Sequence, residues 1–206
     1  NNAQSRVIEM AMVSNNIPYR VYGGLRFFER AEIKSSLAYL RLITNKNDDT
    51  AFLRIVNFPP RGIGAKALEQ IQDIANAEKI SLWQSAEAVE SENKNTKISF
   101  FVHLIRHIED QIQGNNIDES IDFINSYSTL KDHYGKDKDG SSRIENLDEL
   151  VSAAKAYLNE FREENNQDEN GDNKASILAD FLDFTSLESG ELQASAGDDA
   201  LQLMTI

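Results

Sequence analysis

The residues best suited to bind a ligand surround two glycines, Gly62 and Gly64, which are separated by Ile63. Because glycine has no side chain, main-chain N–H groups at such a turn can point outward together. A helical pattern begins directly afterwards at Ala65, and the first N–H groups of a helix are free and carry the positive end of its dipole. Donors arranged in this way bind an anion, most often a phosphate, without reading any base.

Basic residues flank this turn, since Arg61 precedes Gly62 and Lys66 follows Gly64. Positive charge beside free main-chain donors favours contact with a nucleic-acid backbone. The surrounding apolar spacing predicts two short helices packed on each other, as in a helix-hairpin-helix, a non-specific backbone clamp. The apolar residues concerned are Leu53, Val56, Ile63, Leu68 and Ile71. The alternative is that the turn is only a tight connector, because glycine commonly ends a helix.

Charge is distributed unevenly along the chain, whose net charge is −13 over 206 residues. Residues 1–66 contain ten basic and five acidic side chains, whereas residues 67–206 contain eleven basic and twenty-nine acidic ones. Such polarity favours a protein that presents one face to nucleic acid and turns the other away. The acidic half also suits a second class of function, a helical module for protein–protein contacts.

Apolar residues recur at three- and four-residue spacing through most of the chain, which predicts a mainly α-helical fold. We expect helices over residues 3–15, 29–43, 50–58, 65–78, 81–89, 97–113, 120–126, 147–161 and 176–189. Short strands are expected at 19–22 and 201–206. The apolar spacing places three aromatic residues, Trp83, Phe100 and Phe101, in the core.

Several local signals predict where these helices begin and end. Asp49 is expected to cap the helix that follows it, and Pro59 with Pro60 to end that helix. Residues 142–145 read as a capping box, Ser-Arg-Ile-Glu, before the helix from Leu147. Residues 135–140 are expected to form a flexible connector, and the polar, acidic residues 163–174 to be mobile.

The sequence contains little that could support catalysis or metal binding. It has no cysteine, which suits a reducing cytoplasm, and no Gly-Lys-Ser/Thr phosphate loop. Residues 166–171 resemble the start of a calcium-binding loop, but they lack the first acidic ligand, and the bidentate glutamate that such a loop needs is also missing. His103 and His107 have zinc-like spacing but no indicated third ligand. No apolar run could span a bilayer, so no membrane association is expected.

With these residues laid out, the chain resembles superfamily 1 DNA helicases of the UvrD/Rep/PcrA group, and the UvrD branch most closely. Asn-Ala-Gln-Ser-Arg at 2–6 is similar to the body of one family motif. A second motif, Gly-Gly-x-x-Phe-Phe-Glu-Arg-x-Glu-Ile-Lys, is matched by residues 23–34. Two further family motifs are resembled by Arg-Gly-Ile-Gly at 61–64 and by the alternating apolar residues at 201–206. Residues 143–150 also resemble a family stretch, for which we expect a structural role.

The resemblance implies a division of the chain into three parts. Residues 1–30 would belong to the RecA-like motor domain 2A, residues 31–195 to the helical 2B subdomain, and residues 196–206 to a strand returning into 2A. The whole protein would hydrolyse ATP with Mg²⁺ and move 3′ to 5′ on single-stranded DNA during repair and replication. The 2B subdomain would grip the duplex and regulate unwinding.

The resemblance also implies the DNA contacts. The turn from Arg61 to Lys66 would hold the duplex backbone, while Gly23 and Gly24 would line the single-strand path. Arg26 and Lys34 complete the predicted DNA-binding set. The expected partners are duplex DNA and the single-strand/duplex junction, together with repair proteins or a second copy of the chain.

The chain starts without methionine inside a helical pattern and stops in a strand pattern, so we expect a piece of a longer protein. The resemblance implies that this protein is bacterial, and the lack of cysteine suits the cytoplasm. The ATPase motifs lie outside it, and this piece alone should be inactive. A weaker third interpretation is a repair nuclease or glycosylase that uses a helix-hairpin-helix. No catalytic carboxylate or lysine stands near the turn, which argues against that interpretation.

Overall fold

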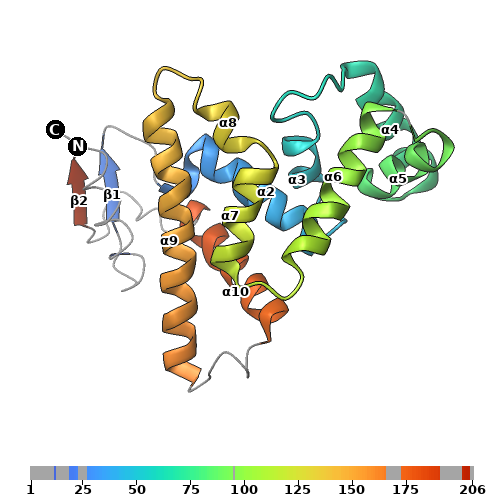
Figure 1. Cartoon of the computed structure of the whole chain (residues 1–206). Coiled ribbons are helices and arrows are strands. Elements are labelled where there is room, and N and C mark those ends of the chain that lie inside the picture. Colours follow the sequence, from blue (N-terminus) through green and yellow to red (C-terminus); the bar gives the residue numbers. More distant parts are fainter. Residues whose placement is uncertain are drawn as a thin grey trace.

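The computed structural model describes residues 12, 19–22, 27–94, 96–165, 173–190 and 201–204, and most of these are helical (Figure 1). After a 3-10 turn, η1 (Phe27–Glu29), the helices are α2 (Ala31–Thr44), α3 (Asp49–Ile55), α4 (Ala65–Glu78), α5 (Leu82–Glu92), α6 (Lys97–Ile112), α7 (Ile117–Tyr127), α8 (Leu130–Tyr134), α9 (Gly140–Asn165) and α10 (Lys174–Gly190). The predicted mainly α class is confirmed. The helix expected over 3–15 falls almost entirely outside the described residues.

Two short strands complete the described structure. Strand β1 (Tyr19–Tyr22) pairs in parallel with β2 (Leu201–Met204), and Tyr19 stands opposite Leu201. Parallel strands need a long connection, and here helices α2 to α10 lie between them.

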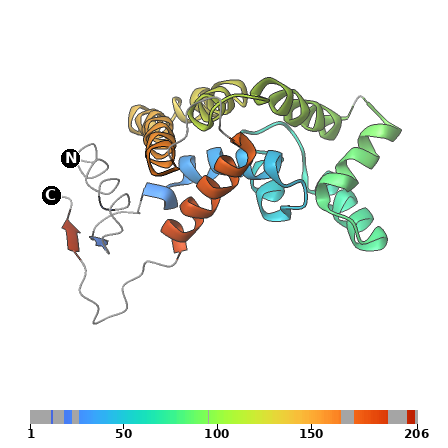
Figure 2. The same cartoon turned by 90° about the horizontal axis from the view of Figure 1, so that it is seen from below.

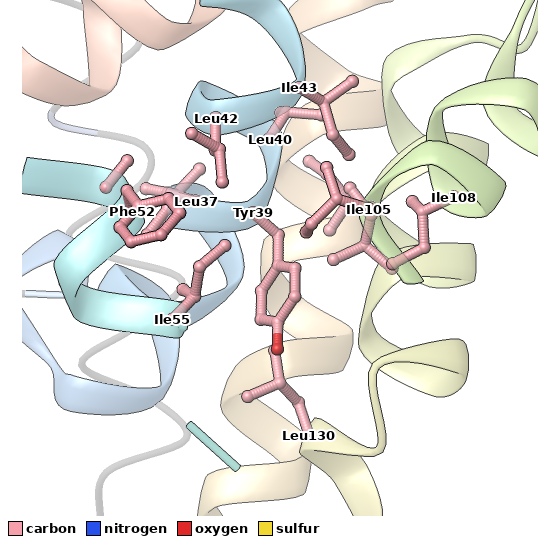
Figure 3. Close-up of a cluster of buried hydrophobic side chains, with 14 of the residues drawn as sticks. Leu37, Tyr39, Leu40, Leu42, Ile43, Phe52, Ile55, Ile105, Ile108 and Leu130 are labelled. Atoms are coloured by element: carbon pink, nitrogen blue, oxygen red, sulfur yellow. The ribbon is translucent and has the colours of Figure 1, made fainter. Parts of the chain in front are cut away.

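Helix α2 is the centre of the core. It packs against α3, α7, α9 and α10 (Figures 1 and 2), and ten of its fourteen residues are buried. Figure 3 shows Tyr39 of α2 with Phe52 and Ile55 of α3 on one side and Ile105 and Ile108 of α6 on the other. Because α2 meets neighbours on several sides, its sequence has no wide polar face.

Helices α4 and α5 extend the molecule at the end opposite α9 (Figure 1). Helix α4 packs on α5, which in turn contacts α6 and α3. Trp83 and Phe101 are buried there in an edge-to-face pair, as expected. The core prediction for Phe100 is wrong, because this residue is 57% exposed while the adjacent Phe101 is fully buried.

The start of α3 differs from the prediction by one residue. Asp48, not Asp49, caps the helix, since its carboxylate accepts from the N–H of Ala51 at 2.8 Å. The carboxylate of Asp49 instead accepts from the N–H of Leu82 at 2.9 Å, the first residue of α5. Asp49 therefore caps a helix that lies far away in sequence.

Residues 128–146 also differ from the prediction. Helix α8 was not expected, and α9 begins at Gly140 rather than Leu147, so the proposed capping box at 142–145 lies inside a helix. Residues 135–140 form a compact turn rather than a loose connector. A Cβ on Gly140 would stand 2.8 Å from the carbonyl oxygen of Tyr134 and 2.7 Å from that of Gly135. The expected mobile segment begins within α9, whose last residue is Asn165.

The stretch from Arg143 has a structural role between α2 and α9. The buried carboxylate of Glu32 accepts from the Asn146 side-chain amide at 2.5 Å and lies 3.8 Å from an Arg143 nitrogen. Arg30 donates to the Asn146 side-chain oxygen at 2.8 Å. Since a buried charge must be paired and hydrogen-bonded, these groups fix α9 against α2.

Candidate nucleic-acid interface

The Gly-Ile-Gly turn lies in the segment between α3 and α4, and Asn57 shapes it. The Asn57 side-chain oxygen accepts from the N–H of Arg61 at 2.9 Å and of Ile63 at 3.1 Å. Between them Gly62 has φ +75°, a conformation that favours glycine. The Ile63 side chain is only 2% exposed and anchors the turn in the core. Sequence reasoning missed Asn57, although an asparagine placed just before a Pro-Pro turn is a recognisable signal.

The guanidinium of Arg61 points into the protein. Its Nη1 donates to the carbonyl oxygens of Ile55 at 3.1 Å and Pro59 at 3.0 Å. Its Nη2 donates to the Tyr39 hydroxyl and to the Ser128 carbonyl oxygen at 3.3 Å. With its donors engaged in this way, Arg61 holds the turn, and contact with a ligand is left to its neighbours.

Tyr39 connects the turn to the core. Its hydroxyl donates to the carbonyl oxygen of Phe58 at 2.8 Å while it accepts from Arg61. Burial raises the pKa of Tyr39 to about 12, and the nearby Arg61 charge offsets only part of that effect. The tyrosine is therefore neutral in the folded protein up to strongly alkaline pH.

The outward face of the turn consists of main-chain donors. Within the described part of the chain, no acceptor binds the N–H groups of Gly62, Gly64, Ala65 or Lys66. Gly64 caps α4 in an extended conformation, and a Cβ placed there would meet nothing within 4 Å. The glycines and Lys66 are exposed, so an anion can approach these donors at the N-terminus of α4.

Two residues that sequence reasoning did not select extend this face. The Lys97 side chain at the start of α6 is 4.0 Å from the position of a Cβ on Gly62. Its Nζ lies 5.8 Å from the centre of the exposed Phe100 ring. The sequence carries no sign of this proximity, because two helices, α4 and α5, lie between the turn and Lys97 in the chain.

The two histidines with zinc-like spacing contact separate partners, and the calcium-like stretch at 166–171 lies outside the described residues. His103 faces Glu90 at 3.5 Å, and the His107 ring packs on Tyr127, with ring centres 4.7 Å apart. In the described ranges no group of histidine, aspartate and glutamate could hold a metal ion. None of the helices described is long and apolar enough to cross a membrane.

Comparison with known proteins identifies the family. All of residues 1–206 match the model of the UvrD-like helicase C-terminal domain. The chain belongs to this family.

Relatives in this helicase family include DNA helicase II of Haemophilus influenzae, 40% identical over 212 residues, and DNA helicase II of Escherichia coli, 39% identical over the same length. The ATP-dependent DNA helicase PcrA of Bacillus subtilis is 34% identical over 211 residues. Each alignment covers the whole chain but only 28% of the relative. The resemblance to the UvrD branch is thereby confirmed.

Within this helicase segment, the predicted DNA-binding residues fall into three groups. Residues 61–66 share one turn, as described above. Lys34 lies on α2 beside a separate cavity that also includes Arg41 and Arg54. Gly23, Gly24 and Arg26 lie outside the described residues. The helix-hairpin-helix stays a prediction, because α4 makes its main contacts with α5, and Leu53 of the predicted apolar set is 46% exposed.

Proposed function

We propose that this chain is the duplex-gripping, regulatory 2B region of an ATP-dependent 3′–5′ DNA helicase of DNA repair and replication. Residues 31–195 form the 2B subdomain, while residues 1–30 and 196–206 belong to the RecA-like domain 2A. The names of the relatives, DNA helicase II and ATP-dependent DNA helicase PcrA, support the activity of the whole protein. ATP and Mg²⁺ would act at residues outside this chain, so the chain alone is inactive.

The observation that carries the proposal is the set of free main-chain donors at the N-terminus of α4. Four N–H groups, those of Gly62, Gly64, Ala65 and Lys66, belong to exposed residues and donate to no acceptor among the described residues, so they are available to phosphate oxygens of either DNA strand. Lys66 and Lys97 add positive charge beside them, and Phe100 adds an exposed ring. Main-chain and lysine contacts fix position without reading bases, as a translocating helicase requires.

A substitution that introduces a negative charge at position 64 tests this contact without damaging the fold. Asp and Ser are both preferred N-cap residues, and the extended backbone and open surroundings of Gly64 accept either. Gly64→Asp places a carboxylate among the phosphate-binding donors, whereas Gly64→Ser adds a neutral side chain of similar size. We expect Gly64→Asp to weaken duplex binding by the full-length protein about tenfold, measured by fluorescence anisotropy at several salt concentrations.

Two controls complete this experiment. Lys66→Ala should reduce the salt dependence of duplex binding by about one phosphate contact, whereas Lys155→Ala, on the exposed side of α9, should not. The melting temperature of both Gly64 variants should equal or exceed that of the parent. If Gly64→Asp and Gly64→Ser bind duplex DNA as the parent does, the turn is a connector.

A further inference from the structure

A cavity of about 510 Å³ lies at the connection between α6 and α7, where the end of α2 and the start of α10 also meet (Figure 1). Most of its surface is apolar, and all four helices contribute to it. The aliphatic lining residues are Ile43 of α2, Ile112 of α6, Ile117 of α7, and Ala175 and Leu178 of α10. A concave, mainly apolar site of this size between packed helices can enclose a ligand group.

The segment around this cavity is strongly acidic. Residues 107–127, from the second half of α6 to the end of α7, contain five acidic side chains and no lysine or arginine. The acidic residues are Glu109, Asp110, Asp118, Glu119 and Asp122. Such a surface attracts cations and repels a nucleic-acid backbone, in contrast to the turn at 62–66.

Two carboxylates belong to the cavity lining, and only one of them has a partner within the described part of the chain. Glu109 lies 2.9 Å from the ammonium group of Lys46. The side chain of Asp110 is exposed and forms no ion pair or hydrogen bond with the described residues. Lys174, also on the lining, donates to the carbonyl oxygen of Gly114. Asp110 is therefore available to a cation supplied by another molecule.

The rim of the cavity is polar and open to solvent. Gln113 and Ala175, on opposite helices of the lining, are both exposed. The side-chain amides of Gln113 and Asn115 have no hydrogen-bond partner among the described residues. A side chain can therefore enter from outside, while these amides bond to main-chain groups of the segment that carries it. An apolar pocket with a polar rim is the usual anatomy of a protein–protein contact.

We propose that this cavity is a docking site for a partner protein that presents an apolar side chain next to an arginine or lysine. The apolar side chain would fill the space beside Ile112, Ile117 and Leu178, and the basic group would pair with Asp110. The buried anchor would supply most of the affinity, and the exposed charge pair would favour basic segments over acidic ones. The inference goes beyond the proposed function, because residues 107–127 belong neither to the turn nor to the predicted DNA contacts.

Three short peptides test the two parts of this chemistry separately. Acetyl-Ala-Leu-Arg-Ala-amide carries both groups, acetyl-Ala-Leu-Glu-Ala-amide reverses the charge, and acetyl-Ala-Ser-Arg-Ala-amide lacks the apolar anchor. Added to the isotope-labelled 206-residue chain, the first peptide should shift the main-chain amide NMR signals of residues 112–117 and 174–178. The serine peptide should bind about tenfold more weakly, because it buries no apolar side chain. The glutamate peptide should bind about threefold more weakly, because an exposed ion pair contributes less than an anchor.

Two exposed positions of the lining provide variants that leave the core intact. Ala175→Gln places a larger polar side chain in the cavity and should weaken binding of the leucine-arginine peptide about tenfold. Ala179→Gln, on the same helix but outside the lining, is its matched control. Asp110→Asn should remove the preference for arginine over glutamate, whereas Asp180→Asn, at an exposed acid of α10 outside the lining, should not. The melting temperature of each variant verifies that it folds.

The peptide series and the variants can each overturn the proposal. It fails if the leucine-arginine peptide shifts no signal of the cavity lining, or if the serine peptide binds as tightly, since the acidic surface would then attract any cation. It also fails if Ala175→Gln binds the leucine-arginine peptide as Ala179→Gln does.

Discussion

Arg61 joins separate segments of the chain, because its guanidinium donates to acceptors at the end of α3, in α2 and at the end of α7. Ile55, one acceptor, is six residues from Arg61 in sequence, whereas Ser128, another acceptor, is 67 residues away. A lysine could not replace it, because an ammonium lacks the planar arrangement of donors. Arg61, one of the residues that the sequence analysis assigned to DNA contact, thus shapes the turn.

Arg61→Ala should therefore act on stability. The substitution leaves part-buried carbonyl oxygens without donors, and we expect the free energy of unfolding in urea to fall by about 2–4 kcal/mol. Lys66→Ala, five residues later on the exposed face, should change it by less than about 0.5 kcal/mol. Equal stability of the two variants would show that the internal contacts of Arg61 contribute nothing.

Tyr39 predicts how stability depends on alkaline pH. Its pKa is about 12 when folded and near 10 when unfolded, so only the unfolded chain ionises between these values. The stability from this residue is complete below pH 10 and is lost as the pH rises toward 12. By pH 11.5 the loss should reach about 2 kcal/mol. Urea unfolding of Tyr39→Phe should show a shallower decline from pH 9 to 11.5, and parallel curves would contradict the assignment.

At the level of elements, the junction between α8 and α9 depends on close approach of two backbones. Gly140 begins α9 at a point where an added Cβ would lie 2.8 Å from the carbonyl oxygen of Tyr134 and 2.7 Å from that of Gly135. Alanine is the better helix former by about 1 kcal/mol, so propensity alone predicts that Gly140→Ala stabilises the protein.

The structure predicts the opposite sign for Gly140→Ala. A methyl group less than 3 Å from two main-chain oxygens forces α8 and α9 apart, and we expect a loss of about 1–3 kcal/mol. Gly64→Ala is the matched comparison, because no atom lies within 4 Å of its added methyl group. Thermal and urea unfolding of both variants measures the difference, and a stabilised Gly140→Ala would refute the close contact.

The elements that sequence predicted well are those with a long apolar period. Helices α2, α4 and α6 lie within two residues of their expected bounds, because each has 14 or 16 residues, long enough for apolar residues to recur at helical spacing. Helix α8 has only five residues, too few to show a period, and two glycines nearby suggested a loop. The early start of α9 depends on Glu32, more than 100 residues away.

At the scale of the whole molecule, some features of the candidate interface depend on residues adjacent in sequence, and others depend on distant segments. The free donors of Gly62 and Gly64 follow from neighbouring residues, so the sequence predicted them. The inward turn of Arg61 and the position of Lys97 depend on segments brought together only by folding. The cavity of Arg41 and Arg54 likewise combines residues from three helices, which periodicity cannot relate to one another.

The hydrogen bond from Arg61 to Tyr39 and the one from Tyr39 to Phe58 have a mechanical consequence. A load applied to the turn passes through a short, stiff linkage into the centre of α2 rather than stretching a slack loop. A force on the turn would therefore reach the buried side chains around Tyr39 that Figure 3 shows.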